Sequence, residues 1–197
     1  MMDAITMIKE RRSVRKFKNE KVDRELMNEI MDLTRWAPSW GNAQVARYTL
    51  IDDDSVIKKL STDGVKGFIY NKAVLENAKG VAVISFVEGK SGKLDKSMND
   101  AFENKDAELE KEGYRTYRSN EWEIFDAGIA CQTFCLAAHA KGVGTCVMGV
   151  IDEKSIAQII ELPSEETVAA LVVYGYEEGE HVAPTPRKDI EEIARFI

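Results

Sequence analysis

The pattern of apolar and polar positions predicts short helices and strands over the first 87 residues. An apolar-periodic segment with Ile5, Met7 and Ile8 indicates a first helix that ends in basic residues. Asp23 is placed to cap a second helix, which carries apolar residues to Trp36 and is stopped by Pro38. The other elements expected here are a strand at 47–51, a helix capped within 52–54 and running through 60, a glycine-containing loop at 61–70, a short helix at 71–78 and a buried strand at 81–87.

Residues 88–120 have a different character, because Lys, Asp, Glu and Asn dominate and few apolar residues remain to be buried. Such a span cannot build a core of its own. We therefore expect a charged helical excursion that lies over the rest of the domain. A lid over a functional site and a solvated helix are both compatible with this composition.

The longest helix is expected at 121–141, where apolar residues surround most of the circumference, so we interpret it as the central core helix. Gly142 stops it, and an extended segment at 143–150 follows with glycines at points of close approach. A helix from Asp152 to Leu162, an apolar strand at 168–176 and a thinly apolar tail at 177–197 complete the chain. Few strands among many helices predict a layered α+β or α/β fold for one domain spanning 1–197.

Composition narrows the possible partners and the compartment. The formal net charge is −7, and Lys and Arg are scattered except at 8–18, so no broad basic surface for nucleic acid is expected. No apolar run is long enough to cross a bilayer, and the N-terminus lacks the apolar core of a signal peptide, which predicts a cytoplasmic protein without membrane contact. Cys131, Cys135 and Cys146 lack the spacing of a metal site, so we interpret them as core thiols in a reducing compartment.

The candidate chemistry begins with a basic segment, Arg11-Arg12-Ser13-Val14-Arg15-Lys16-Phe17. Cations suit a helix C-terminus, so a solvated helix end is one interpretation. Forked guanidinium donors beside a hydroxyl also suit charge-assisted binding of phosphate. The chain has neither a GxGxxG nor a GxxxxGK[ST] loop, so side chains would have to hold any phosphate.

A second candidate is the amide loop at 38–44, which combines turn-forming residues with side-chain amides. A loop that binds a ligand and a plain turn between helix and strand both fit this composition.

Five segments together resemble the FMN-dependent nitroreductase family. They are Arg-Arg-Ser-Val-Arg-Lys-Phe at 11–17, Ala-Pro-Ser-Trp-Gly-Asn-Ala-Gln at 37–44, Asp-Ala-Gly-Ile-Ala-Cys-Gln at 126–132, Gly-Val-Gly-Thr-Cys at 142–146 and Pro-Arg-Lys at 186–188. The resemblance implies an α+β homodimer with a mixed central sheet flanked by helices and a long helix at the interface. It also implies a C-terminal extension that wraps the partner subunit, and one FMN in each of two interfacial clefts.

The resemblance further implies roles for individual residues. A cation at Arg15 would stabilise the negative charge that reduced flavin carries near N1 and O2. The implied contacts are Arg11, Arg12 and Ser13 with the phosphate and ribityl chain, Arg15 with the pyrimidine end, Pro38, Ser39 and Trp40 along the flavin from the other subunit, Asn42 and Gln44 as supporting amides, Asn71 at the pyrimidine edge, the backbone N–H groups of Met148 and Gly149 near N5 and O4, and Arg187 with Lys188 at the phosphate.

Two positions depart from the family pattern. Val45-Ala46 stands where many members have Pro-Trp after the amide loop, and Met148 stands where many have Glu. The first departure affects the packing beneath the loop, and the second any carboxylate-ordered water near N5. Neither removes a residue implied to bind phosphate.

The implied activity is a two-electron ping-pong reaction. NADH or NADPH would deliver hydride to flavin N5 and leave, and a nitroaromatic, quinone or similar electron-poor acceptor would take its place. No side-chain acid or base is required, so His139 and His181 receive no catalytic role. Two alternatives stay open: a flavin-binding carrier or sensor without turnover, and a basic segment that binds nucleic acid or a phosphorylated partner.

Overall fold

A four-stranded sheet forms the centre of the computed structural model, which describes residues 3–65, 68–91 and 119–197. Its order is β1-β2-β4-β3, with bounds Ala46–Ile51 (β1), Gly80–Val87 (β2), Gly144–Met148 (β3) and Glu166–Gly175 (β4). The three ladders are antiparallel, and the parallel component of the sheet is an isolated bridge between Ser13 and Thr145. The expected strands at 47–51, 81–87 and 168–176 are confirmed within one or two residues.

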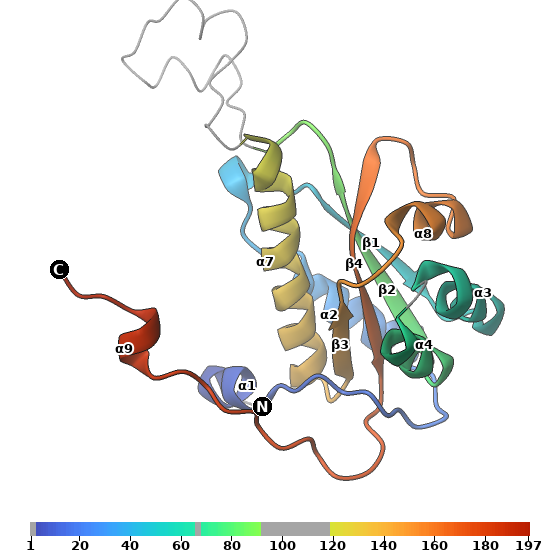
Figure 1. Ribbon diagram of the computed structural model, residues 1–197, viewed down its shortest axis with the longest axis horizontal. Helices are drawn as coiled ribbons and strands as arrows, with labels where there is room; N and C mark the ends of the chain where they lie inside the picture. Colours follow the sequence, from blue (N-terminus) through green and yellow to red (C-terminus); the bar gives the residue numbers. More distant parts are fainter. Residues whose placement is uncertain (1–2, 66–67, 92–118) are drawn as a thin grey trace, which may run out of the picture.

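Helices cover both faces of this sheet (Figure 1). One face carries α2 (Arg24–Thr34) and α7 (Ser119–Ala140), with Ile30 and Phe134 fully buried between them and the strands. The other face carries α3 (Asp54–Lys59), α4 (Ile69–Glu76) and α8 (Glu153–Ile159), where Leu75 and Ile156 are fully buried. The layered α+β architecture expected from the sequence is therefore confirmed.

Aspartates begin most of the short helices, as the sequence indicated. Asp23 accepts a hydrogen bond from Leu26 N at the start of α2, and Asp53 and Asp152 do the same for α3 and α8. Asp3 caps α1 (Ala4–Glu10), and Asp189 forms a capping box with Glu192 in α9 (Ile190–Ile193). Each such cap satisfies backbone N–H groups that have no partner inside the helix, which matters in helices this short.

The prediction of a loop at 61–70 is wrong for the first half of that range. Residues Leu60–Gly64 (η2) continue α3 as a π-helical turn, and α4 begins at Ile69. The Ser61 and Thr62 hydroxyls donate to the carbonyl oxygen of Lys58, so polar side chains that suggested a loop extend the helix instead.

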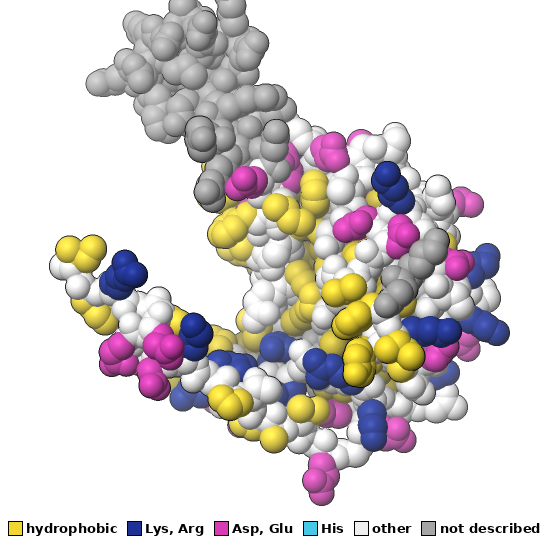
Figure 2. Space-filling view, viewed as in Figure 1, with side chains coloured by type: hydrophobic (Ala, Val, Ile, Leu, Met, Phe, Trp, Pro, Cys, Tyr) yellow, Lys and Arg dark blue, Asp and Glu magenta, His cyan; other side chains and the backbone are white. Residues whose placement is uncertain are grey.

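The longest helix is less buried than its composition suggested. The sheet covers only one side of α7, and on the other side Ile124 and Phe125 are 48% and 58% exposed. We call this side the α7 stripe, and it consists of Ile124, Phe125, Gly128, Ile129 and Leu136, all exposed or half-exposed. Figure 2 shows hydrophobic side chains gathered on this side of the molecule. An apolar stripe of this kind indicates an unfilled packing surface.

The tail runs along the body only at its beginning. Lys18 N donates to the Tyr176 carbonyl and Glu178 N to the Lys16 carbonyl, after which the chain turns away and ends far from the sheet (Figure 1). Residues 178–197 are all exposed.

Most of the excursion expected at 88–120 lies outside the described residues. Within 3–65, 68–91 and 119–197, no helix combines the length and apolar character that a bilayer crossing requires.

Candidate functional site

The basic segment is fixed along the outer edge of β3. After α1 ends, Val14 N donates to the Thr145 carbonyl at 2.9 Å, and the Val14 side chain is buried against Gly144. A Cβ at Gly144 would stand 2.7 Å from a Val14 methyl carbon, so only glycine permits this approach. The arginines on either side of Val14 are thus anchored to the sheet rather than carried on a free helix end.

The arginines of this segment have different partners. Arg12 donates from one guanidinium nitrogen to the carbonyls of Lys9 and Arg11, at 2.6 and 2.9 Å, which satisfies acceptors at the end of α1. Exposed Arg15 donates to the Ser13 carbonyl at 3.2 Å. The half-buried Arg11 guanidinium has no hydrogen bond within the described parts of the chain. Arg11 is therefore the arginine most available for an anion.

A polar cavity of about 180 Å³ lies between this segment, the end of α7 and the start of the tail. Among the described residues, the buried side-chain atoms without a hydrogen-bond partner all belong to its lining: Arg12 Nε, His139 Nε2, Thr145 Oγ1 and Glu177 Oε1. Buried polar groups are normally paired, so this cavity suits water or the polar part of a ligand. The donors and acceptors present fit the phosphate and hydroxyl groups of a nucleotide-like cofactor.

Two histidines close this cavity from the side of the tail. Their rings stack with centroids 6.4 Å apart, and His181 lies 2.8 Å from a Glu177 carboxylate oxygen and 2.9 Å from the Glu10 carbonyl. Both ring nitrogens of His181 thus face acceptors, which favours the doubly protonated ring. The Glu177 carboxylate and then the Glu10 carbonyl raise the pKa of His181, whereas burial and then the charge of His181 lower the pKa of His139.

We expect the stabilisation by His181 to be lost at alkaline pH. Its raised pKa means that the contact is fully present below the unfolded pKa of about 6.5 and disappears as pH rises through the higher folded value. The difference in melting temperature between wild type and His181→Ala should therefore shrink from about pH 6 to about pH 9, measured by differential scanning fluorimetry.

His139→Asn is the matched comparison for this experiment. The lowered pKa of His139 means that its stabilisation is present above about pH 6.5 and is lost as pH falls. Its difference from wild type should therefore shrink toward acid, the opposite trend. A His181→Ala difference that grew with pH would contradict the assignment.

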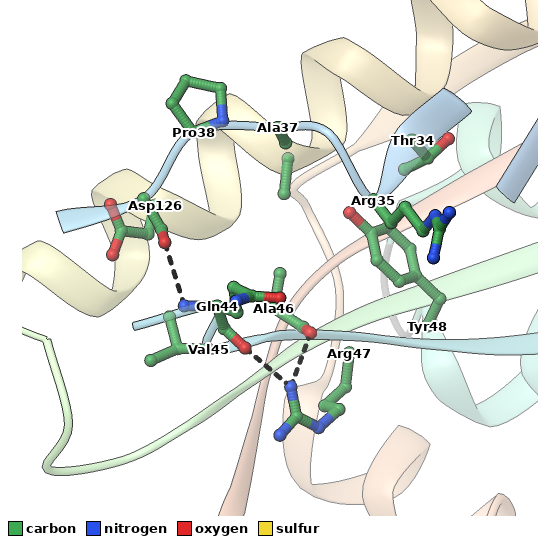
Figure 3. Close-up of a pocket in the computed structure, with 12 residues that line it drawn as sticks. Thr34, Arg35, Ala37, Pro38, Gln44, Val45, Ala46, Arg47, Tyr48 and Asp126 are labelled. Atoms are coloured by element: carbon green, nitrogen blue, oxygen red, sulfur yellow. Dashed lines mark hydrogen bonds between the residues drawn. The ribbon is translucent and has the colours of Figure 1, made fainter. Parts of the chain in front are cut away.

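The amide loop at 38–44 is held in an unusual backbone conformation. Within η1 (Trp40–Asn42) and just after it, φ is positive at Gly41, Asn42 and Gln44, at 50°, 56° and 49°. A left-handed conformation costs a residue other than glycine about 1–2 kcal/mol, so the surroundings must impose it. Gln44 N donates to Ser39 Oγ, and Arg47 donates to the Gln44 carbonyl (Figure 3). Imposed strain of this kind is typical of functional loops.

Asp126 is the residue here to which the sequence gave no role. It lies in α7, is 2% exposed, and accepts from Trp40 N at 3.0 and 3.2 Å and from Ser91 Oγ at 2.5 Å. It also lines a cavity of about 150 Å³ with Pro38, Ser39 and Gln44 (Figure 3). A carboxylate inside an apolar helix was the available signal, because such a group needs buried partners.

A third group of implied contacts meets at the end of β3. Asn71 of α4 donates from Nδ2 to the Val150 carbonyl at 3.0 Å, which joins this amide to the segment after Met148 and Gly149. The Thr145 carbonyl points to the outer edge of the sheet, where it accepts from Val14 N. Backbone N–H and C=O groups alternate in direction along a strand, so those of Gly149 also point outward and those of Met148 point toward β4. A Cβ at Gly149 would meet nothing within 4 Å. The open edge at Gly149 therefore leaves room for a ligand.

One chain does not bring all these groups together. Asp126, which holds the amide loop, and His139, beside the basic segment, are separated by thirteen residues of α7, a rise of about 20 Å. Arg187 donates to Thr185 and to the Pro186 carbonyl within the tail, and both Arg187 and Lys188 are exposed. The chain thus carries separated partial sites with the α7 stripe between two of them.

Comparisons with known proteins find similar sequences and a similar fold. A sequence model of the nitroreductase family matches residues 8–176. The NADH dehydrogenase of Thermus thermophilus is 27% identical over 203 residues, which cover 98% of this chain and 95% of the relative. The 4-nitrobenzoate reductase of a Nocardioides species is 26% identical over 229 residues, covering 99% and 88%. The solved structure of an FMN-dependent nitroreductase from Clostridium difficile superposes with a TM-score of 0.70 at 26% identity, over 98% of each chain.

Proposed function

This chain belongs to the nitroreductase family, and from that premise we propose that it is an FMN-dependent oxidoreductase that uses NADH or NADPH to reduce an electron-poor small molecule. The relatives that support this include one named for NADH and one named for 4-nitrobenzoate. FMN, when bound, supplies the two-electron transfer between the nicotinamide and a nitroaromatic or quinone-like acceptor.

The residues of the basic segment are suited to hold the phosphate end of FMN. The Arg11 guanidinium lies beside the polar cavity without a hydrogen bond to any described residue, and Arg12 and Ser13 are fixed next to it by the bridge to β3. Arg15, two residues further along the sheet edge, would place positive charge near the flavin ring. Asn71 and the open backbone edge at Gly149 lie at the end of the same strand, where amide donors would orient the ring.

We propose that a second copy of this chain completes the cleft. Two α7 stripes paired about a two-fold axis perpendicular to the helix would run antiparallel, so that the amide loop of one subunit, near the start of its α7, would approach the basic segment of the other. Pro38, Ser39, Trp40, Asn42 and Gln44 would then face the flavin from the partner. The α7 stripe, apolar and exposed between the two half-sites, is the observation that carries the proposal.

No side chain is needed as a catalytic acid or base in this scheme, because solvent can protonate a reduced acceptor. The protein binds the cofactor, orients the reactants against it and limits access to the ring. Met148 in place of a carboxylate is compatible with this scheme, because the scheme needs no side-chain acid or base.

The test is FMN binding followed by anaerobic reduction. Apoprotein titrated with FMN should quench flavin fluorescence and gain thermal stability, and NADH or NADPH should then bleach the bound flavin until an acceptor such as 4-nitrobenzoate or a benzoquinone restores its colour. Protein that binds no FMN would exclude both flavin functions. Bound FMN that neither nucleotide reduces would leave a flavin-binding protein without turnover.

We expect removal of residues 182–197 to weaken the dimer while leaving the subunit folded. After His181 the tail is exposed along its whole length and turns away from the sheet (Figure 1), and its exposed side chains include Ile190, Ile193 and Phe196. Burying even one such side chain against a partner contributes about 1.5–3 kcal/mol, so the dimer dissociation constant should rise at least roughly tenfold. Sedimentation equilibrium measures this, with circular dichroism as the folding control. Native dimer stability in the truncated chain would show that the tail does not clasp the partner.

A further inference from the structure

Asp126 joins three segments that lie far apart in the sequence. Its carboxylate accepts from Trp40 N in the amide loop and from Ser91 Oγ in the chain that follows β2, while its own backbone belongs to α7. Ser91 is fully buried and Asp126 nearly so. A buried carboxylate needs several donors, and the described residues supply one backbone amide and one hydroxyl.

We propose that Asp126 is a positioning residue for the cofactor cleft: by binding Trp40 N it holds the left-handed amide loop in the shape that faces the flavin of the partner subunit. The inference rests on the proposed function, because the loop of one chain can face the flavin of the other only if two chains form the cleft. Asn42 and Gln44 both have positive φ although neither residue type requires it, so a contact from outside these residues must select that conformation.

The two partners of Asp126 constrain different groups. Trp40 is the first residue of η1, directly before Gly41, so a bond to its N–H fixes the point at which the left-handed backbone begins. The bond from Ser91 Oγ to Oδ2 gives the carboxylate a second donor and limits its rotation. Internal bonds then carry the constraint onward, because Asn42 N and Gln44 N both donate to Ser39, to its carbonyl and its hydroxyl.

The same helix provides a matched control. Glu123, one turn before Asp126, is 4% exposed and accepts from the backbone N–H of Gly89 at 2.8 Å. It has similar burial and the same kind of bond, but it contacts the turn after β2 and not the amide loop. Removing either carboxylate should lower thermal stability, and only the loss of Asp126 should disturb the loop.

The first measurement uses the apoprotein and needs no cofactor. Hydrogen exchange followed by mass spectrometry should show faster exchange in a peptide spanning residues 38–44 in Asp126→Ala, and unchanged exchange there in Glu123→Ala. Asp126→Asn should restore protection in part, because its amide oxygen can still accept from Trp40 N. Unchanged exchange of the loop in Asp126→Ala would overturn the inference even if the protein binds FMN.

The second measurement is FMN affinity. Losing the partner of a buried hydrogen-bond donor should raise the dissociation constant about tenfold in Asp126→Ala, with a smaller rise in Asp126→Asn and none in Glu123→Ala. An equal rise in Glu123→Ala would mean that general destabilisation is responsible, and would overturn the inference. If wild type itself binds no FMN, the proposed function fails, and loop exchange still decides whether Asp126 positions the loop.

A mixed dimer tests whether Asp126 acts across the interface. Co-expressed with two different tags, one chain carries Asp126→Ala and the other Arg11→Ala. If the loop serves the partner's cleft, both defects fall in the same cleft and the other is intact, so the heterodimer should bind one FMN with wild-type affinity. Two equally weakened sites would place the loop and the basic segment of one chain in the same cleft, and would overturn the assignment to the partner subunit.

Discussion

Replacing Arg11 with alanine is expected to weaken FMN binding by roughly 10- to 100-fold while leaving the fold intact. Arg11 is the arginine of the basic segment whose guanidinium has no hydrogen bond within the described parts of the chain, and it borders the polar cavity. A hydrogen bond to a charged group contributes about 1.5–3 kcal/mol, which corresponds to this range of affinity. Fluorescence titration of the apoprotein with FMN measures the change.

Two comparisons make this result specific. Arg24→Ala removes an exposed arginine at the start of α2, outside the lining of the cavity, and should leave the affinity unchanged. Riboflavin lacks the phosphate, so its affinity should be nearly the same in wild type and Arg11→Ala. An equal loss for FMN and riboflavin would show that Arg11 does not bind the phosphate. Arg12→Ala should also lower stability, because Arg12 satisfies carbonyl oxygens at the end of α1.

Replacing Gly128 with leucine is expected to separate the proposed dimer without unfolding the subunit. A Cβ at Gly128 would meet nothing within 4 Å in its own chain, and leucine favours a helix interior by several tenths of a kcal/mol or more over glycine. If two α7 stripes pair, however, the added side chain enters a packed interface. Overpacking costs about 1–3 kcal/mol per site, and the two-fold axis doubles it, so the dissociation constant should rise by roughly 30-fold or more.

Sedimentation and FMN titration together test this prediction. A cleft completed by the partner subunit should lose its cofactor when the dimer separates, so Gly128→Leu should weaken FMN binding although Gly128 belongs to neither half-site. Lys154→Leu adds the same side chain to an exposed position of α8, on the opposite face of the sheet, and should affect neither property. A stable Gly128→Leu dimer with normal FMN affinity would remove α7 from the interface.

Local sequence signals predicted the elements well where the physical cause was local. Asp23, Asp53 and Asp152 cap helices through bonds that span only two or three residues, and the apolar run of β2 needs no distant information to be recognised. The prediction failed at Ser61 and Thr62, whose hydroxyls favour either a turn or a helix end depending on which carbonyl they reach. The local sequence does not indicate which carbonyl these hydroxyls reach.

The candidate site also has a part that the sequence predicted and a part that it did not. The sequence supplied the residue types, arginines with a serine in one segment and amides with turn formers in another, and their assignment to FMN stays a prediction. It could not indicate that Arg12 bonds back to its own helix or that Asp126 holds Trp40 from 86 residues away. Such contacts depend on which side chains the fold brings together.

By itself the sequence determined most of the helices and strands, the layered α+β class and the residue types of each candidate segment, because caps, periodicity and charge act over a few residues. Only the tertiary structure decided that the sheet covers one side of α7, which leaves the stripe exposed, and that the amide loop and the basic segment lie at opposite ends of that helix. The physical reason is that an apolar helix surface is equally satisfied by a sheet or by a second subunit. The sequence of α7 therefore predicts that this surface is buried, but it does not predict whether the sheet or a second subunit buries it.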